Sequence, residues 1–273
     1  MKHLLAAVLL FSAALFSAEI AWKTDIAVAF ADAKAQQKIV MIDFYTDWCG
    51  WCKKLDAETY VNANVLALAK DFVALKVNPE KSKQADELRA RYNVQGYPNI
   101  VFADADGAIV YLINGFAGPK EFAQKMTDVL AMQKKFIQYQ AEYRKGITTN
   151  GAEYLDLLVM RQRILEAIPL FHKLSGKGFS KEKRAQYELS FGAYYGEHKD
   201  YRKALAFFQD AEKNGAGNET AWQAIYYRAV TMNLSGNTKG ALSLLKKYID
   251  DKKTPAVWKE RLGNLSSELS QEK

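Results

Sequence analysis

The sequence predicts an α/β domain followed by an all-α domain of helical repeats. Short apolar runs rich in β-branched residues alternate with helical segments up to about residue 135. Beyond residue 151 the strand signals stop, and three alanines recur 37 residues apart, at Ala167, Ala204 and Ala241. Such a fixed period is typical of a repeat architecture. With 273 residues and 49% apolar composition, the chain is long enough for two packed cores.

The first eighteen residues contain one lysine and then an apolar run from Leu4 to Ala18 that only serines interrupt. This pattern resembles a bacterial secretory signal peptide. The run of fifteen residues is shorter than a membrane span, which needs about 20. We therefore expect residues 1–18 to be a signal peptide and the protein to be periplasmic, with an uncleaved inner-membrane anchor as the alternative. An exported protein is not expected to bind nucleic acid.

The next element is a predicted buried strand at 39–45, and a Cys-Gly-Trp-Cys run follows it. Cys49 and Cys52 are the two cysteines of the chain, spaced so that one thiolate attacks a disulfide and the other resolves the product. Residues 53–58 predict a helix. Cys49 should then lie at a strand-to-helix junction, where free backbone N–H groups favour a thiolate, and Cys52 should be less exposed.

The same cysteine spacing also supplies half of many zinc sites. The other ligand types do not complete such a site, because His3, His172 and His198 lie far apart and no second cysteine pair exists. A closed zinc site needs four ligands. We predict neither a metal nor an organic cofactor.

Asp43 interrupts the otherwise apolar run at 39–45. A carboxylate buried there would be costly, and burial would raise its pKa and suit it to accept a proton from Cys52. The alternative is a strand-end aspartate that faces water. Lys76, in a predicted strand at 72–78, is a candidate charge partner for Asp43. An edge-strand lysine turned to solvent is the alternative there.

Gly96, Tyr97 and Pro98 stand immediately before a predicted strand at 99–102. Proline cannot donate to a strand ladder, so Pro98 needs a special backbone position, and a cis Tyr97–Pro98 bond would meet that need. A further apolar run at 109–113 predicts another strand, and Gly115 follows it.

In order and spacing, these residues resemble the thioredoxin superfamily over about residues 25 to 135. The resemblance implies an α/β domain at 19–135 with a central mixed sheet flanked by helices. It also implies catalytic roles: Cys49 as the nucleophile, Cys52 as the resolving thiol and Asp43 as the buried carboxylate with Lys76 as its partner.

The resemblance further implies that Pro98 is a cis-proline facing the cysteines and that substrate backbone docks beside it like an added strand. Gly115 would lie on the docking rim, a strand-end turn being the alternative. Trp48 and Trp51, together with Tyr97, are interpreted as an apolar rim that holds substrate peptide, although partly buried packing would also explain the tryptophans. Thioredoxin itself has proline where Trp51 stands, and residues between the cysteines tune the redox poise, so the direction of electron flow stays open.

Helical composition continues beyond residue 119, and we expect one long helix, with a helical linker and loop at 136–150. In the repeats at 151–273, a large apolar side chain follows each repeated alanine by four residues, and Leu155, Gly192 or Ala229 precedes it by twelve. The copy around Gly192 resembles the tetratricopeptide pattern. We expect Pro169 to kink or shorten its helix.

The last helix is expected to begin with Thr254 as its N-cap and Pro255 at its first position, and to close the stack. Residues 136–273 carry 22 basic and 16 acidic side chains, whereas residues 19–135 carry 15 of each. The basic excess fits an acidic partner or an anionic surface, but also ordinary solvated helix faces.

The leading hypothesis is an exported thiol–disulfide oxidoreductase, acting as a reductase on protein substrates through Cys49 and Cys52. Since the chain has no further cysteines, a redox partner protein must supply or remove electrons. The repeat domain would bind a client protein. The alternative is a protein-binding or chaperone-like scaffold with little redox turnover.

Overall fold

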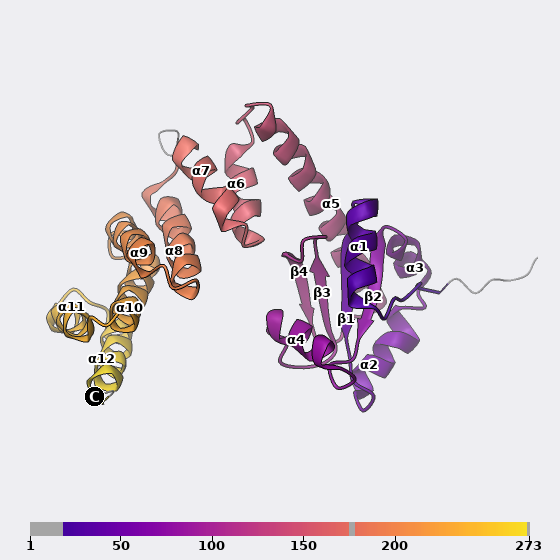
Figure 1. Ribbon diagram of the computed structural model, residues 1–273, viewed down its shortest axis with the longest axis horizontal. Coiled ribbons are helices and arrows are strands. Elements are labelled where there is room, and N and C mark those ends of the chain that lie inside the picture. The colour runs from indigo at the N-terminus through magenta and orange to yellow at the C-terminus, as the bar shows by residue number, and fades with distance from the viewer. Residues whose placement is uncertain (1–18, 175–177, 272–273) are drawn as a thin grey trace, which may run out of the picture. The chain divides into compact units, whose positions relative to one another are not determined.

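A computed structural model describes residues 19–174 and 178–271 of the chain, so the predicted signal peptide at 1–18 lies outside the described residues. The chain forms two compact units that divide between Lys134 and Lys135. The first is an α/β unit and the second is helical (Figure 1).

The described part of the first unit contains a four-stranded sheet with the order β2-β1-β3-β4. Its strands are β1 (Ile39–Phe44), β2 (Phe72–Val77), β3 (Asn99–Ala103) and β4 (Ile109–Asn114). β1 runs parallel to β2 and antiparallel to β3, and β3 runs antiparallel to β4. The mixed sheet that the sequence predicts is therefore confirmed.

Helices cover both faces of this sheet. Buried residues of α1 (Ile26–Gln36) and α4 (Lys83–Arg91) pack with one face. Buried residues of α3 (Ala63–Ala69), the first part of α5 (Pro119–Arg144) and the π-helix η1 (Leu55–Thr59) pack with the other. The short helix α2 (Gly50–Lys54) runs directly into η1. β1 lies between two layers of helices, so all six of its residues are buried.

Alternation along β1 assigns its side chains to the two faces. Val40, Ile42 and Phe44 belong to the core shared with α1 and α4, whereas Ile39 and Met41 belong to the core shared with η1, α3 and α5. Because strand side chains alternate, Asp43 faces the second of these cores. This register directs the carboxyl of Asp43 toward the helical segment that follows the cysteines.

The outer edge of β2 is covered by the N-terminal segment. The Lys23 N–H donates to the carbonyl of Ala74 at 2.8 Å, and the Lys76 N–H donates to the carbonyl of Lys23 at 2.9 Å. These bonds form a parallel bridge between Lys23 and Leu75. Residues before the first helix are thus part of the sheet, which the sequence pattern does not predict.

The described part of the second unit is all-α, as the sequence predicts. Its helices are α6 (Gly151–Met160), α7 (Ile164–Leu174), α8 (Lys181–Glu197), α9 (Tyr201–Gly215), α10 (Glu219–Leu234), α11 (Thr238–Asp250) and α12 (Ala256–Gln271). Each contacts the next along the chain. Ala167, Ala204 and Ala241 lie on α7, α9 and α11 and are fully buried. The 37-residue period thus places one buried alanine on every second helix, α7, α9 and α11.

Three details of the second unit bear on the expected helix at Pro169 and on the expected linker and loop at 136–150. α7 continues through Pro169 to Leu174. α6 begins at Gly151, directly after the expected loop. Phe136, in the expected linker at 136–150, is buried against Tyr154 with a ring separation of 5.6 Å. That part of α5 therefore belongs to the core of the second unit.

The expected N-cap of the last helix is wrong. α12 begins at Ala256, and the Pro255 carbonyl accepts the Lys259 N–H at 2.9 Å. The Thr254 hydroxyl instead donates to the carbonyl of Tyr248 at 2.6 Å. Thr254 therefore ties the end of α11 to the following loop. Across residues 19–174 and 178–271, no helix combines the length and the apolar character needed to cross a membrane.

Candidate active site at Cys49 and Cys52

Cys49 lies between the end of β1 and the start of α2, at the junction that the sequence predicts. Its Sγ accepts the Cys52 N–H at 3.1 Å, so Cys49 is the N-cap of α2. The two cysteines form a disulfide with Cα atoms 5.3 Å apart. Each is 4% exposed, so the expectation that Cys52 is less exposed than Cys49 is wrong for the oxidised protein.

The loop that carries Cys49 is held by the loop after β2. Asp47 pairs with Lys81 at 2.5 Å and accepts a hydrogen bond from the Asn78 amide at 3.2 Å. The hydrogen bond from Lys81 lowers the pKa of Asp47. The Trp48 indole N–H donates to the Glu80 carboxylate at 2.9 Å. Because β1 and β2 are parallel, the loops that follow them lie at the same end of the sheet.

Asp43 is buried with 1% exposure, which decides between the two interpretations that the sequence leaves open. Desolvation by burial raises the pKa of Asp43 to about 7, and the charge of Lys76 partly opposes this rise. The nearby Tyr60 hydroxyl also lowers this pKa. Neither the Tyr60 hydroxyl nor Oδ1 of Asp43 has a hydrogen-bond partner among the described residues. A carboxyl poised near neutrality can accept and return a proton at physiological pH.

Lys76 stands directly beside Asp43 in the register of β1 and β2. Its Nζ lies 3.7 Å from Asp43 Oδ2 and 2.5 Å from Asp56 Oδ1. The lysine side chain is 18% exposed, so it does not turn to solvent as an ordinary edge-strand lysine would. Asp56 takes the closer position and its negative charge raises the pKa of Asp43. Two carboxylates thus share one ammonium group.

The two tryptophans next to the cysteines in sequence, Trp48 and Trp51, are exposed. Trp48 is 67% exposed and Trp51 is 58% exposed, so neither is packed in the core. Trp48 meets the Tyr97 ring edge-on at 6.1 Å, and Trp51 lies 5.6 Å from the Phe116 ring. Two aromatic pairs therefore border the disulfide, and they present apolar surface to solvent.

Pro98 and Gly115 lie side by side at the ends of β3 and β4. The Tyr97–Pro98 bond is cis, as the resemblance implies. The Gly115 N–H donates to the Pro98 carbonyl at 2.9 Å. Gly115 has a φ of 84°, a conformation that favours glycine and fits the turn at the end of a strand. The roles of Pro98 and Gly115 in substrate docking stay predictions.

Four residues that complete the site were missed by sequence reasoning: Asp56, Tyr60, Glu80 and Phe116. A signal exists for Asp56, which follows Cys52 by four residues and so shares its helix face. The other three are brought to the site by tertiary packing. Among the described residues, no group of three or more histidine, cysteine or acidic side chains could hold a metal ion.

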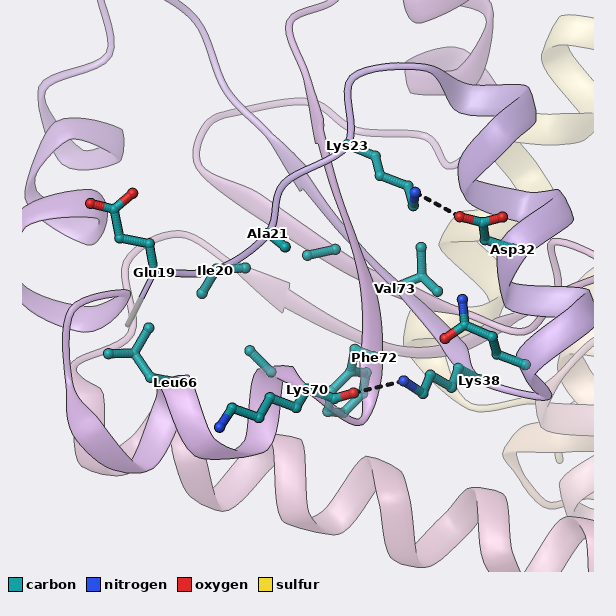
Figure 2. Close-up of a pocket in the computed structure, with 13 residues that line it drawn as sticks. Glu19, Ile20, Ala21, Lys23, Asp32, Lys38, Leu66, Lys70, Phe72 and Val73 are labelled. Atoms are coloured by element: carbon teal, nitrogen blue, oxygen red, sulfur yellow. Dashed lines mark hydrogen bonds and ion pairs between the residues drawn. The ribbon is translucent and has the colours of Figure 1, made fainter. Parts of the chain in front are cut away.

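A separate cavity of about 380 Å³ lies at the opposite end of the sheet, where β1 and β2 begin. Figure 2 shows Ile20, Leu66 and Phe72 on its apolar side and the Lys23–Asp32 ion pair on its rim. β1 and β2 are parallel, and Cys49 follows the end of β1. This cavity therefore does not contribute to the cysteine site.

Comparison with known proteins supports the resemblance to the thioredoxin superfamily. Residues 26–130 match the family model described as a thioredoxin-like domain. The thiol:disulfide interchange protein DsbD of Vibrio cholerae is 38% identical over 111 residues, which cover 40% of this chain and 18% of that protein. The DsbD of Actinobacillus pleuropneumoniae is 39% identical over 74 residues, covering 27% and 13%. The match spans less than a fifth of either relative.

Solved structures with a similar first unit include a DsbH oxidoreductase, 23% identical with a TM-score of 0.40, covering 46% of this chain and 94% of that one. The oxidised C-terminal domain of Neisseria meningitidis DsbD is 24% identical with a TM-score of 0.35, covering 40% and 98%. A Thermus thermophilus thioredoxin is 27% identical with a TM-score of 0.38, covering 41% and 88%.

Proposed function

We propose that this chain, whose residues 26–130 match the thioredoxin-like domain family, is a thiol–disulfide oxidoreductase that reduces disulfides of protein substrates. The observation that carries the proposal is the Cys49–Cys52 disulfide at the start of α2, after the strand that carries the buried Asp43 carboxyl with a pKa of about 7. The similarity to thiol:disulfide interchange proteins supports the same chemistry.

In the proposed reaction, the Cys49 thiolate attacks one sulfur of a substrate disulfide and releases the other as a thiolate, which leaves a mixed disulfide. Asp43 then accepts the proton of Cys52. The Cys52 thiolate attacks Cys49 Sγ, releases the second substrate thiol and forms the Cys49–Cys52 disulfide that the structure contains. Two electrons pass to the substrate, and a redox partner protein must return them.

The aromatic rim would receive the substrate. Trp48 and Trp51 expose their rings beside the disulfide, and apolar residues flanking a substrate cysteine would bury that surface on binding. Pro98 and Gly115 lie at one edge of the same site, where substrate backbone would dock. This arrangement suits an extended peptide segment better than a small molecule.

We further propose that the protein is exported to the periplasm and that the helical unit binds a protein partner. The signal-like composition of residues 1–18 supports export. The stacked helices, with small residues repeated every 37 positions, resemble tetratricopeptide repeats. A partner held there would be either the substrate or the protein that returns electrons.

The test uses two variants of the purified protein. Cys49→Ser should abolish reduction of a protein disulfide such as insulin, whereas Cys52→Ser should accumulate a mixed disulfide because the resolving thiol is missing. We expect both variants to keep the fold, since serine is close to cysteine in size. A wild-type protein that fails to reduce insulin, or an unaltered phenotype in cells carrying Cys49→Ser, would favour the scaffold alternative.

A further inference from the structure

Lys76 is held in an aromatic cage. Its Nζ lies 5.4 Å from the Trp22 ring centroid, 5.1 Å from that of Tyr45 and 5.7 Å from that of Tyr60. Ring faces attract an ammonium group without carrying a charge of their own. They can therefore fix the position of Lys76 without neutralising it, and its charge stays available to the carboxylates beside it.

Trp22 belongs to a different part of the chain from Tyr45 and Tyr60. Tyr45 follows β1 and Tyr60 follows η1, so both belong to the elements that build the cysteine site. Trp22 comes from the N-terminal segment, before the first helix. Its ring packs edge-on against Tyr60 at 5.0 Å. The third wall of the cage is therefore supplied from outside the Cys49–Cys52 loop.

The segment that carries Trp22 also holds the backbone of Lys76. The neighbouring Lys23 accepts the Lys76 N–H at 2.9 Å and donates to Ala74 at 2.8 Å. The Lys23 side chain pairs with Asp32 of α1 at 2.6 Å, the ion pair drawn in Figure 2. Ile20 of the same segment is buried in the core. These contacts hold the Trp22 ring in place. The N-terminal segment therefore contacts Lys76 twice, at its backbone N–H through Lys23 and at its ammonium group through Trp22.

We propose that Trp22 is a positioning residue for the disulfide chemistry: its ring keeps the Lys76 ammonium between Asp43 and Asp56. The proposal rests on the proposed function, because Asp43 matters only if it accepts the Cys52 proton. The groups that act on the Asp43 carboxyl are Lys76 from β2 and Asp56 and Tyr60 from η1 and its end. Of these, Lys76 is the cation, so its position sets how readily Asp43 ionises.

Without the Trp22 ring, Lys76 would sample positions farther from Asp43. The charge of Lys76 lowers the pKa of Asp43, so its withdrawal raises that pKa. Asp43 would then become a proton acceptor only at higher pH. Cys49 attack would be unaffected, because that step does not use Asp43.

The experiment follows the reduced protein as it reacts with 2,2′-dithiodipyridine. Cys49 attack releases the first thiopyridone, and Cys52 attack on the mixed disulfide releases the second while the protein dithiol becomes a disulfide. The pH dependence of each phase is measured for wild type, Trp22→Leu, Trp22→Phe and Leu66→Ala. Leu66 packs against the same core as Ile20, and so controls for lost packing.

We expect Trp22→Leu to move the midpoint of the second phase upward by about half a pH unit, the scale of one cation–π contact. Trp22→Phe, which keeps a weaker ring, should shift it less, and Leu66→Ala should not shift it. If circular dichroism shows that Trp22→Leu does not fold, the midpoint of the second phase in Trp22→Phe alone tests the proposal. A second phase with the wild-type midpoint in the folded Trp22 variants would overturn the proposal. A wild-type protein without a second phase would instead overturn the proposed function.

Discussion

Asp43 is a carboxyl that opposes folding whenever it is ionised. It is buried at 1% exposure, and its partner Lys76 lies 3.7 Å away and is shared with Asp56. An incompletely paired charge in a core costs free energy unless the group becomes neutral. Retaining such a group makes sense where its proton is needed, as in the proposed resolution step by Cys52.

Replacement of Asp43 by asparagine should therefore stabilise the oxidised protein at alkaline pH. The pKa of Asp43 is raised from 3.8 to about 7, so the folded state binds this proton more tightly than the unfolded state. The stabilising contribution of the protonated form is complete below pH 3.8 and is lost as pH rises through 7. At pH 8 we expect Asp43→Asn to raise the free energy of unfolding by about 2–3 kcal/mol.

Urea unfolding at several pH values measures this difference. The gap between Asp43→Asn and wild type should widen from pH 4 to pH 8 and then level off. A gap that is constant across this range would show that Asp43 titrates at an ordinary pKa and would remove it as a proton acceptor.

Asp56 should tune the same carboxyl through Lys76. Its charge raises the pKa of Asp43, and it holds Lys76 at 2.5 Å. Asp56→Asn removes the competing charge, so the pKa of Asp43 should fall and the second phase of the dithiodipyridine reaction should begin at lower pH. The matched control is Glu58→Gln, an acidic residue of the same π-helix that pairs with Lys54 at 3.9 Å and lies away from Lys76. An equal shift in both variants would indicate a general charge effect.

Site residues that stand out in their local sequence could be predicted. Site residues that only tertiary contacts bring to the cysteines could not. Cys49, Cys52, Asp43 and Pro98 stand out because each is chemically unusual in its local run. Trp22 does not, because it is far from the cysteines in sequence and reaches the site only through the bridge between Lys23 and Leu75.

Among the elements, helices α8 and α9 of the second unit pack a small residue against a large one. Gly192 of α8 faces Phe208 of α9, and a Cβ added at Gly192 would lie 2.6 Å from ring atoms of Phe208. Phe208 is 2% exposed and has no room to move away. Close packing therefore requires glycine at this position.

Gly192→Ala should lower the free energy of unfolding by about 1–3 kcal/mol, the usual cost of overpacking. Gly196→Ala on the same helix is the control, because its Cβ would have 4.0 Å to the nearest atoms. Alanine favours a helix over glycine, so this control should be neutral or slightly stabilising. Thermal unfolding followed at 222 nm measures both; equal stability of the two variants would contradict the packing account.

The strands and helices follow from the sequence because apolar periodicity determines which face each element buries. The apolar pattern does not predict features that depend on individual hydrogen bonds. The π-helix at Leu55–Thr59 adds one residue per turn to an ordinary helical run. The cap expected at Thr254 fails because its hydroxyl bonds back to Tyr248.

At the scale of the whole molecule, the two units differ in charge and in chemistry. The α/β unit carries the cysteines and balanced charge, whereas residues 136–273 carry 22 basic and 16 acidic side chains. If the helical unit binds an acidic partner protein, raising the salt concentration should weaken that complex. The Cys52→Ser variant, used to trap mixed disulfides from a periplasmic extract, should capture fewer proteins at 0.5 M than at 0.05 M salt. Capture that is independent of salt would contradict an electrostatic role.

The central claim is that the Cys49–Cys52 pair donates electrons to protein disulfides. The most direct test equilibrates the purified protein with dithiothreitol or glutathione buffers of known composition and follows the exposed Trp48 and Trp51 by fluorescence. We expect a reduction potential near that of thioredoxin, about −270 mV. A value near that of DsbA, about −120 mV, would make the protein an oxidant and contradict the account, as would a pair that fails to cycle.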